Sequence, residues 1–186
     1  LYSSQKEKEK QLQLEKENQL KKIKKMIITL MVTLLLFITV TSSFKIIPTG
    51  YTGVRTTFKQ VDNVVLQNGL NFKLPFVQKI ITVNNKMQDM DFAGPIWSET
   101  SERTALYYAN ITVSYQINPE KSAWIYANVS GYKDNLISDS IVASAIKSSS
   151  KTLNSTEATN RSLIEPLTQE TLQASLDSKY GENTVI

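Results

Sequence analysis

The residue types that most often perform catalysis are scarce in this sequence. The chain of 186 residues contains no Cys and no His, so it supplies no thiol nucleophile, catalytic imidazole, Cys/His zinc site or disulfide. The remaining polar clusters are Ser138-Asp139-Ser140 and the group Glu99, Glu102 and Arg103. A serine nucleophile in the first cluster would need Lys147 or Lys151 as its base. Because serines and lysines on helix surfaces are usually solvated, we predict that the chain is not an enzyme.

The acidic residues and glycines also lack the spacing that ions or phosphates require. Asp89, Asp91 and Glu99 do not follow the pattern of a calcium-binding loop, and no Gly-rich segment resembles a phosphate cradle. We therefore expect no metal site and no cofactor.

The excess of positive charge lies at the N-terminus. The chain has 21 Lys and Arg against 17 Asp and Glu, and residues 1–25 hold eight Lys but only four Glu. The rest of the chain is therefore neutral in sum. A nucleic-acid-binding protein spreads basic residues over its folded surface, so we expect no nucleic-acid partner.

A long apolar segment follows this charged tail of residues 1–25. Residues 26–44 form a run of 19 residues without charge, Pro or Gly between Lys25 and Lys45. As a helix, the run is about 28 Å long, close to the thickness of a membrane hydrocarbon core. Its threonines can donate to the carbonyl one turn earlier, so they oppose membrane insertion less than charges would. The segment predicts one transmembrane helix over 26–44.

Two other interpretations of the apolar segment remain open. A cleavable signal peptide is one, since Val40-Thr41-Ser42 places small residues near a suitable cleavage point. However, the run is longer than a signal-peptide core, and a tail of 25 residues precedes it. A buried helix of a soluble protein is the other, but such helices are rarely apolar on every face. We therefore favour a retained anchor.

The orientation of the anchor follows from Lys21, Lys22, Lys24 and Lys25, which crowd one end of it. The fifteen residues beyond the other end contain only Lys45, Arg55 and Lys59. Basic residues stay on the cytoplasmic side, so we predict a cytoplasmic N-terminus, or a matrix one in mitochondria. The region after residue 44 would then be extracytoplasmic. The tail itself is predicted as a solvated helix, with a membrane-surface or partner-binding helix as alternatives.

Short β-rich segments with intervening turn residues follow the anchor. Residues 54–59 and 77–84 are predicted strands, with a turn at Asn68-Gly69, and together they indicate a small antiparallel sheet. Residues 105–117 alternate strictly, with Tyr107, Ala109, Ile111, Val113, Tyr115 and Ile117 on one face. This period of two predicts a single long strand that is wet on one side.

Helical patterns dominate the second half of the chain. Asn118-Pro119 predicts a helix start, with a helix ending near Gly131. A further helix is predicted over 133–148, and Asn154 with Glu157 three residues later predicts another helix start. A last helix is predicted over about 163–180, with Pro166 in its first turn and Gly181 as its C-terminal cap. Strands followed by helices and a final strand at Val185-Ile186 predict an α+β domain.

Gly, Pro, Leu and aromatic residues occur in a characteristic order near both ends of this region. They are Pro48, Gly50, Gly53, Gly69, Leu70, Phe72, Pro75, Phe76, Tyr180 and Gly181. With this set, residues 45–186 resemble the SPFH (Band 7) domain, most of all its prohibitin-like branch. One departure is that Lys59 follows Phe58 where relatives often have a Gly. We divide the domain into two lobes, about 45–103 and 104–186.

The resemblance implies a membrane scaffold without catalytic activity. SPFH proteins, which include prohibitins, stomatins, flotillins and bacterial regulators of the FtsH protease, assemble into large homo- or hetero-oligomers. They organise membrane microdomains and restrict the access of membrane proteases to substrates. Their oligomers usually have a C-terminal coiled coil, which we expect beyond residue 186, since the sequence lacks an initial Met and ends as a strand begins.

The apolar residues near the anchor suggest contact with lipid. Phe72, Phe76 and Trp97 are our candidates for side chains that dip into the bilayer, and core packing is the competing interpretation. A different function is also open at this stage. The chain could be a monomeric, membrane-anchored binding or sensor module that uses the wet face of the strand over 105–117.

Overall fold

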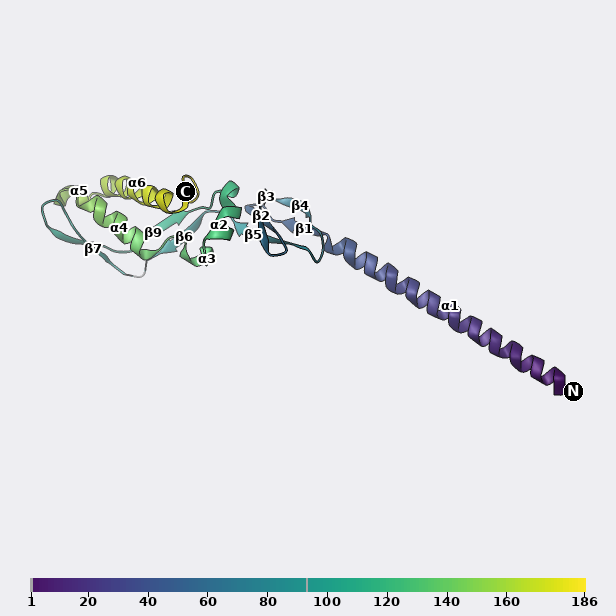
Figure 1. Ribbon diagram of the computed structural model, residues 1–186. Coiled ribbons are helices and arrows are strands. Elements are labelled where there is room, and N and C mark those ends of the chain that lie inside the picture. The colour runs from purple at the N-terminus through teal and green to yellow at the C-terminus, as the bar shows by residue number, and fades with distance from the viewer. Residues whose placement is uncertain (1, 93) are drawn as a thin grey trace. The chain divides into compact units, whose positions relative to one another are not determined.

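The structure is a computed structural model that describes residues 2–92 and 94–186, with side chains from residue 13 onward. It divides into two compact units, Leu1–Phe44 and Lys45–Ile186, which we describe separately. Figure 1 labels their helices and strands. The predicted tail of residues 1–25 and the apolar segment share one helix, α1 (Tyr2–Ser42). This helix ends two residues before the predicted limit of the span because Phe44 already begins strand β1 (Phe44–Ile47), which pairs with β4 (Gly69–Phe72).

A three-stranded antiparallel sheet forms the first part of the Lys45–Ile186 unit. Its strand order is β3-β2-β5, with β2 over Tyr51–Thr57, β3 over Gln60–Leu66 and β5 over Gln78–Asn84. Val54 and Val83 are fully buried on its inner face. The sequence prediction of a small antiparallel sheet is confirmed, but β3 was missed because Asp62-Asn63 interrupts the apolar pattern of that strand.

Two antiparallel strand pairs follow this sheet. Strand β6 (Gln88–Asp91) pairs with β9 (Thr112–Tyr115), and β7 (Ile96–Glu99) pairs with β8 (Ala105–Tyr108). The prediction of one strand over 105–117 is therefore wrong. The backbone of Asn110 turns into the left-handed region, with φ of 55°, and this conformation ends β8 before β9 starts.

The break also changes which residues face inward. Before Asn110, Leu106 and Tyr108 are partly buried and Tyr107 is exposed, whereas Ile111, Val113 and Tyr115 are the more buried residues after it. Three positions separate Tyr108 from Ile111, so the period of two shifts by one residue at the break. The apparent alternation over the whole segment therefore placed Tyr107 on the wrong face.

The helices begin at a 3-10 turn, η1 (Pro119–Lys121), with Asn118 as its predicted cap, since the Asn118 side chain accepts from the Glu120 amide. They continue as α2 (Ser122–Asn128), α3 (Tyr132–Asn135), α4 (Asp139–Ser150), α5 (Ser155–Thr159) and α6 (Arg161–Tyr180). We predicted that Gly131 ends α2, but this is wrong. Gly131 instead precedes α3 and has a left-handed conformation with φ of 63°.

Two further helix predictions need correction. The predicted helix over 133–148 is broken between α3 and α4, where Ser138 adopts an extended backbone and the adjacent Leu136 and Ile137 are both buried. Pro166 lies at the sixth position of α6 rather than in its first turn, because Asn160 caps the helix through the Ser162 amide and starts it earlier. The predicted capping box at Asn154 and Glu157 is confirmed.

A continuous hydrophobic cluster runs through the Lys45–Ile186 unit. It joins Val54 and Val83 of the sheet to Ile125 of α2, and then to the side chains of α4 and α6. Leu172, Leu176 and Tyr180 of α6 are buried against this cluster. Because burial of each large apolar side chain stabilises the fold by about 1.5–3 kcal/mol, this cluster fixes the arrangement of strands and helices. The division into lobes over about 45–103 and 104–186 stays a prediction.

Candidate functional site

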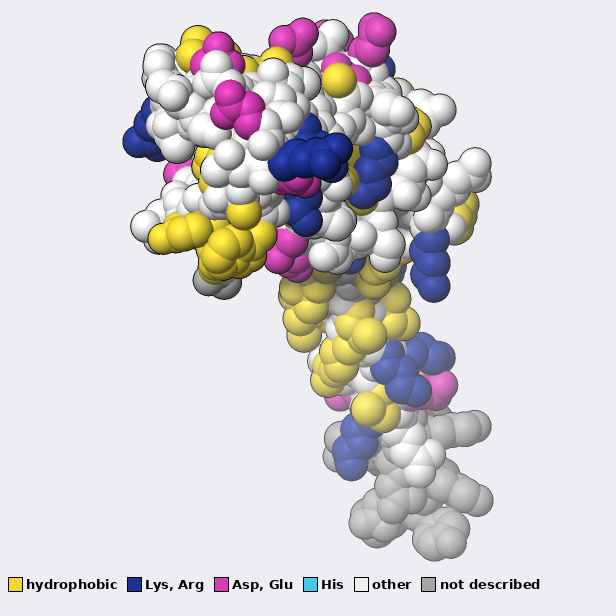
Figure 2. Space-filling view, turned by 90° about the vertical axis from the view of Figure 1, so that its left-hand side faces the viewer, with side chains coloured by type: hydrophobic (Ala, Val, Ile, Leu, Met, Phe, Trp, Pro, Cys, Tyr) yellow, Lys and Arg dark blue, Asp and Glu magenta, His cyan; other side chains and the backbone are white. Residues whose placement is uncertain are grey.

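Helix α1 exposes apolar side chains along its C-terminal half. Leu30, Leu35 and Phe37 are each about two thirds exposed, and none of the most apolar stretch of the helix is buried. Figure 2 shows these apolar side chains as a yellow band on α1, with dark blue Lys side chains at the end of the band that lies toward the N-terminus. Contact with water disfavours so long an apolar surface. This helix near the N-terminus is long and apolar enough to span a membrane between Gln13 and Ser42.

The threonines of α1 satisfy their hydroxyl groups within the helix. Thr29 donates to the Lys25 carbonyl at 2.9 Å, and Thr39 donates to the Leu35 carbonyl at 2.7 Å. The Thr33 and Thr41 hydroxyls donate one turn back in the same way. These bonds confirm the sequence interpretation that the threonines lower the apolar character of the segment only modestly.

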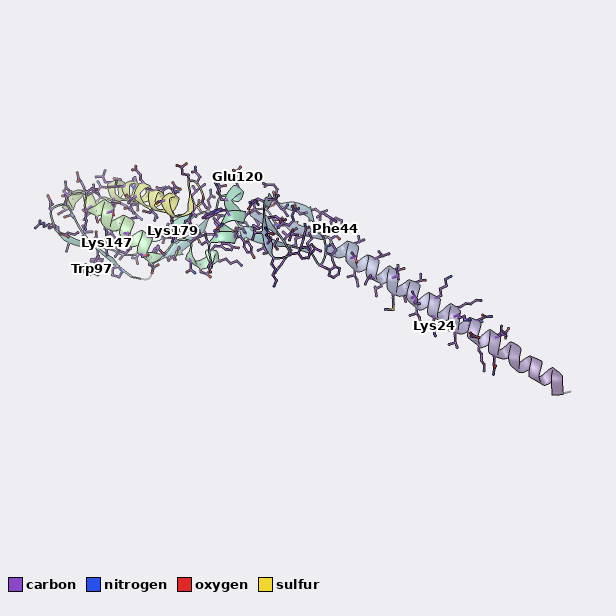
Figure 3. The ribbon with its side chains drawn as sticks, in the orientation of Figure 1. Lys24, Phe44, Trp97, Glu120, Lys147 and Lys179 are labelled. Carbon is purple, nitrogen blue, oxygen red and sulfur yellow. The ribbon has the colours of Figure 1, made fainter. Side chains whose placement is uncertain are left out.

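The four lysines that we predicted to determine topology lie on α1 directly before its apolar half. Lys21, Lys22, Lys24 and Lys25 are all exposed, and Figure 3 labels Lys24 on the helix. Lys21 also pairs with Glu17 one turn earlier, at 3.0 Å. Among the described residues, the other three lysines of this cluster form no ion pair, so most of its positive charge is unpaired.

Among the family-motif residues, Gly53 shows the clearest structural requirement. It lies in β2, where a Cβ atom would overlap with Ile47 Cδ1 and lie 3.0 Å from Ile80 Cγ2. Gly53 therefore lets the buried Ile47 of β1 pack onto the central strand. Gly50 permits the turn before β2, with φ of 82°, and Pro48 accepts the Tyr51 amide in that turn.

The last two motif residues close α6. The Tyr180 hydroxyl is buried and donates to the Leu136 carbonyl at 2.8 Å, which joins α6 to the segment before α4. Gly181, with φ of 89°, caps the helix and donates its amide to the Asp177 carbonyl. Both residues therefore serve the fold.

The remaining motif residues belong to an exposed apolar segment. Gly69 starts β4 with φ of 113°, and Leu70, Phe72, Leu74 and Phe76 follow it, each about half exposed or more. Phe76 is the most exposed of them at 91%. Pro75 precedes Phe76 in a tight turn in which the Gln78 amide donates to the Leu74 carbonyl at 2.9 Å. The competing interpretation of core packing therefore does not apply to Phe76.

Trp97 does not join this segment. It lies on β7 opposite Tyr107 of β8, with ring centroids 5.2 Å apart, and both residues are about 60% exposed. Figures 1 and 3 place β7 and Trp97 at one end of the Lys45–Ile186 unit and β4 at the other. The three residues predicted to contact lipid are thus divided between two ends of the unit.

Sequence reasoning missed Phe58 as a surface residue. Phe58 lies between β2 and β3, has φ of 48° and is 78% exposed. In the sequence it looked like the end of a strand. A signal was nevertheless present, because an aromatic residue just after a β-rich segment, next to Lys59, would be exposed if the turn fell there.

The first polar cluster does not form a catalytic arrangement in the described structure. The Ser138 and Ser140 hydroxyls lie 3.0 Å apart and share a hydrogen bond at the start of α4. Lys147 is exposed two helical turns after Ser140, about 10 Å along the axis. Among the described residues, no group of three or more acidic side chains is placed to hold a metal ion.

The second polar cluster connects a loop to a helix. Glu102 accepts from both the amide and the hydroxyl of Ser155, at 3.2 and 2.8 Å, at the first position of α5. These bonds to Ser155, the side-chain bond first, lower the pKa of the Glu102 carboxyl below its ordinary value. Glu102 therefore holds the loop between β7 and β8 against α5.

A buried polar network joins the sheet to α2. Thr52 contacts Asn85 Oδ1 and Ser122 Oγ, both at 2.7 Å, and Asn85 donates to the Ile117 carbonyl at 3.0 Å. Thr52 and Ser122 are almost fully buried. Because buried polar groups are costly without partners, this network fixes the position of α2 on the sheet.

The fold and these motifs define an α+β domain preceded by a helix that is long and apolar enough to span a membrane. The family model of the SPFH domain / Band 7 family matches residues 45–182. The chain therefore belongs to the SPFH domain / Band 7 family, which confirms the predicted SPFH (Band 7) domain and fold class. The likeness to the prohibitin-like branch stays a prediction. A search of curated proteins found no match to the chain.

Proposed function

We propose that this protein is a single-pass membrane scaffold that assembles through its SPFH domain into a large oligomer, has no catalytic role and organises the membrane around it. The observation that carries the proposal is the position of the domain. Its match begins at residue 45, three residues after the end of a helix that is long and apolar enough to span a membrane. An SPFH domain in this position is held at the lipid surface by its own chain.

The charge around α1 supports one orientation. Four exposed lysines precede the apolar half of α1, and Lys21 among them pairs with Glu17. The N-terminus would therefore stay in the cytoplasm, or in the matrix if the membrane is mitochondrial. The SPFH domain would then be extracytoplasmic. Its described residues hold no disulfide, so the fold does not depend on the redox state of that compartment.

Assembly would arise from many weak contacts between neighbouring domains. Tethering to a bilayer raises the effective concentration of each domain near the next one, so modest pairwise affinities give a stable ring. Other SPFH proteins are the expected partners in a hetero-oligomer, in the manner of the prohibitin-like branch. Such a ring would fence a patch of lipid and restrict the access of an FtsH-type membrane protease to its substrates.

Extraction in mild detergent followed by native mass measurement tests the assembly. We expect the full-length protein to form a species of many subunits, and a monomer at every concentration would contradict the proposal. The effect on proteolysis is tested separately, by following the lifetime of a known substrate of the membrane protease with and without this protein. An unchanged lifetime would leave the scaffold but remove the protease from the proposal.

The alternative of a monomeric sensor stays a prediction. It required the wet face of one strand over 105–117, and that segment is divided between β8 and β9. The exposed hydroxyls of Thr112 and Ser114 on β9 are already hydrogen-bonded to Asp91 and Asp89, both at 2.6 Å. Purification of a monomer with one defined ligand would favour this alternative over the scaffold.

A further inference from the structure

Two exposed turns lie side by side in the Lys45–Ile186 unit and form what we call the double-turn tip, residues 57–59 and 74–78. The Phe58 amide donates to the Val77 carbonyl at 3.1 Å, which joins the turn after β2 to the turn before β5. The Gln78 side chain contacts both turns, since it accepts from the Leu74 amide at 2.9 Å and donates to Thr57 Oγ1 at 3.3 Å. The tip is therefore a fixed structure that holds its side chains in place.

The tip combines a strained backbone with two exposed phenylalanines. Phe58, Lys59 and Phe76 have φ values of 48°, 69° and 66°, a region that side-chain-bearing residues rarely adopt. A two-residue hairpin turn such as that at 58–59 normally uses Asn or Gly. Yet Phe58 and Phe76 are 78% and 91% exposed. Strain combined with exposed aromatic rings points to a binding role, because water alone favours neither.

The tip also lies in the basic part of a domain that is neutral in sum. Residues 45–84 contain five basic side chains, Lys45, Arg55, Lys59, Lys73 and Lys79, and one acidic side chain, Asp62. Asp62 is paired with Arg55 at 2.7 Å. Residues 85–186 contain eight basic and twelve acidic side chains. Figure 2 shows Asp and Glu side chains along the upper edge of the face seen from the β7 end of the unit.

The covalent path from α1 to the tip is short. Strand β1 begins two residues after α1 ends, and it pairs with β4. Neighbouring strands lie about 4.8 Å apart, and four residues separate Phe72 at the end of β4 from Phe76 in the tip. If α1 spans a membrane, the nearest large partner for the tip is therefore the headgroup layer of that membrane.

We propose that the double-turn tip inserts Phe58 and Phe76 into the membrane interface and that Lys59 and Lys73 bind anionic phospholipid headgroups beside them. This inference rests on the proposed membrane anchoring and adds a lipid preference to it. Aromatic rings in the interface with flanking lysines match the chemistry of an anionic bilayer. The SPFH domain would thus select the lipid that surrounds it.

The absence of Cys in the native chain allows a direct depth measurement. Spin labels are placed one at a time at Phe58→Cys, Phe76→Cys and, as the reference at the other end of the unit, Trp97→Cys. The full chain is reconstituted in vesicles of phosphatidylcholine, with or without one quarter phosphatidylglycerol. We expect the labels at 58 and 76 to be accessible to oxygen and protected from a water-soluble nickel reagent in the anionic vesicles, and the label at 97 to remain accessible to nickel.

Charge reversal tests the role of the lysines. Each lysine near an anionic surface changes the docking equilibrium by about five-fold, so Lys59→Glu with Lys73→Glu should shift it by at least about 25-fold and expose both labels. The matched control is Lys147→Glu with Lys151→Glu, two exposed lysines of the α4 end, and it should leave the labels protected. A spin label at the exposed position Gln60→Cys leaves both phenylalanines in place, so we expect it to be protected from nickel. Adding Phe58→Ser and Phe76→Ser to this labelled protein should abolish the protection.

Three outcomes would overturn the proposal. Labels at 58 and 76 that are as accessible to nickel as the label at 97 would exclude insertion. Protection that is equal in neutral and anionic vesicles would exclude headgroup selection. Protection that persists in detergent and rises with protein concentration would assign the tip to a second copy of this chain. In the same samples, resistance to alkaline extraction reports on membrane anchoring, and the native mass reports on assembly. A failure of the proposed function is therefore distinguishable from a failure of the tip to bind lipid.

Discussion

Gly53 shows how a single hydrogen atom in place of a methyl group can decide the packing of a sheet. The space that a Cβ atom would need is already occupied by Ile47 and Ile80, and Leu66 approaches it from the third side at 3.2 Å. Ile47 is itself almost fully buried, so it has no free space into which to move. The residue that joins β1 to the central sheet is thus the smallest one in the region.

We expect Gly53→Ala to destabilise the domain by about 1–3 kcal/mol, because the added methyl group overpacks this contact. The midpoint of thermal unfolding of the full chain in detergent, followed by near-UV circular dichroism, measures the effect. Gly94→Ala is the matched control, since a Cβ atom at position 94 would meet no atom within 4 Å. An equal effect of both substitutions would show that the crowding at Gly53 is not the cause.

Asp62 gives the domain a dependence on pH. The hydrogen bond from Arg55, followed by that from Thr57 Oγ1, lowers the pKa of the Asp62 carboxyl, and its burial opposes this only in part. A carboxyl whose pKa is lower in the folded state stabilises that state above its unfolded pKa. The contribution is lost as the pH falls through the folded pKa.

We therefore expect Asp62→Asn to lower the urea midpoint at neutral pH and to have a shrinking effect as the pH falls below about 4, where aspartates ordinarily become protonated. The measurement is a series of urea titrations of both proteins across this range. A difference between the two proteins that stays constant down to the lowest pH would show that the charge of Asp62 does not contribute.

At the scale of elements, the short helix α5 depends on its cap. Asn154 accepts from the Glu157 amide at 2.9 Å, and Glu157 accepts from the Asn154 amide at 3.0 Å. We expect Asn154→Ala to cost about 1 kcal/mol, since it leaves the Glu157 amide without this acceptor. Asn154→Ser keeps an acceptor and should remain close to the native stability. Chemical denaturation of both variants checks the prediction.

Helix α6 contains a residue that weakens it. Pro166 lacks the amide that would bond to the carbonyl of Ser162, and it lies on the exposed side of the helix. We expect Pro166→Ala to raise the stability by about 1–3 kcal/mol, measured by thermal unfolding. Pro95→Ala, in an exposed loop outside any helix, should instead have a small destabilising effect through the unfolded chain. A loss of stability with Pro166→Ala would indicate that the proline itself is required at this position.

At the scale of the whole molecule, the distribution of lysines predicts the topology. We expect Ser130→Cys to react with a membrane-impermeant maleimide in intact cells and Gln19→Cys to react only after permeabilisation. Replacement of Lys21, Lys22, Lys24 and Lys25 by Glu should produce a mixed or inverted orientation, because basic residues near the span determine it.

The control for topology replaces four lysines of the SPFH domain by Glu, namely Lys121, Lys133, Lys147 and Lys151. These lie far from the span in sequence, so the orientation should not change. Labelling of Gln19→Cys in intact cells with the native lysines present would contradict the predicted orientation.

Much of the architecture was predictable because its signals are local. The N-caps at Asn118 and Asn154 and the C-cap at Gly181 require only neighbouring residues. Short-range patterns failed where the backbone turned without a Gly or Pro. Asn110 divided one apparent strand in two in this way.

The candidate surface was predicted only in part, for a related reason. Phe72 and Phe76 follow turn residues, and this position predicts exposure, whereas the β-rich pattern of residues 54–59 includes Phe58 in a predicted strand. Trp97 was grouped with them because the sequence gives no distance between two loops. Its location on β7, paired with Tyr107, depends on strand pairing between positions far apart in the chain.

The sequence by itself determined the α1 helix, its apolar half and the charge beside it, since helix formation and membrane affinity depend on consecutive residues. It also determined the family, through an ordered set of Gly, Pro and aromatic positions. Only the tertiary structure decided that Phe58 and Phe76 share one tip and that Trp97 lies elsewhere. Strand pairing and the hydrogen bonds of Gln78 create that proximity, and they join residues that no local pattern connects.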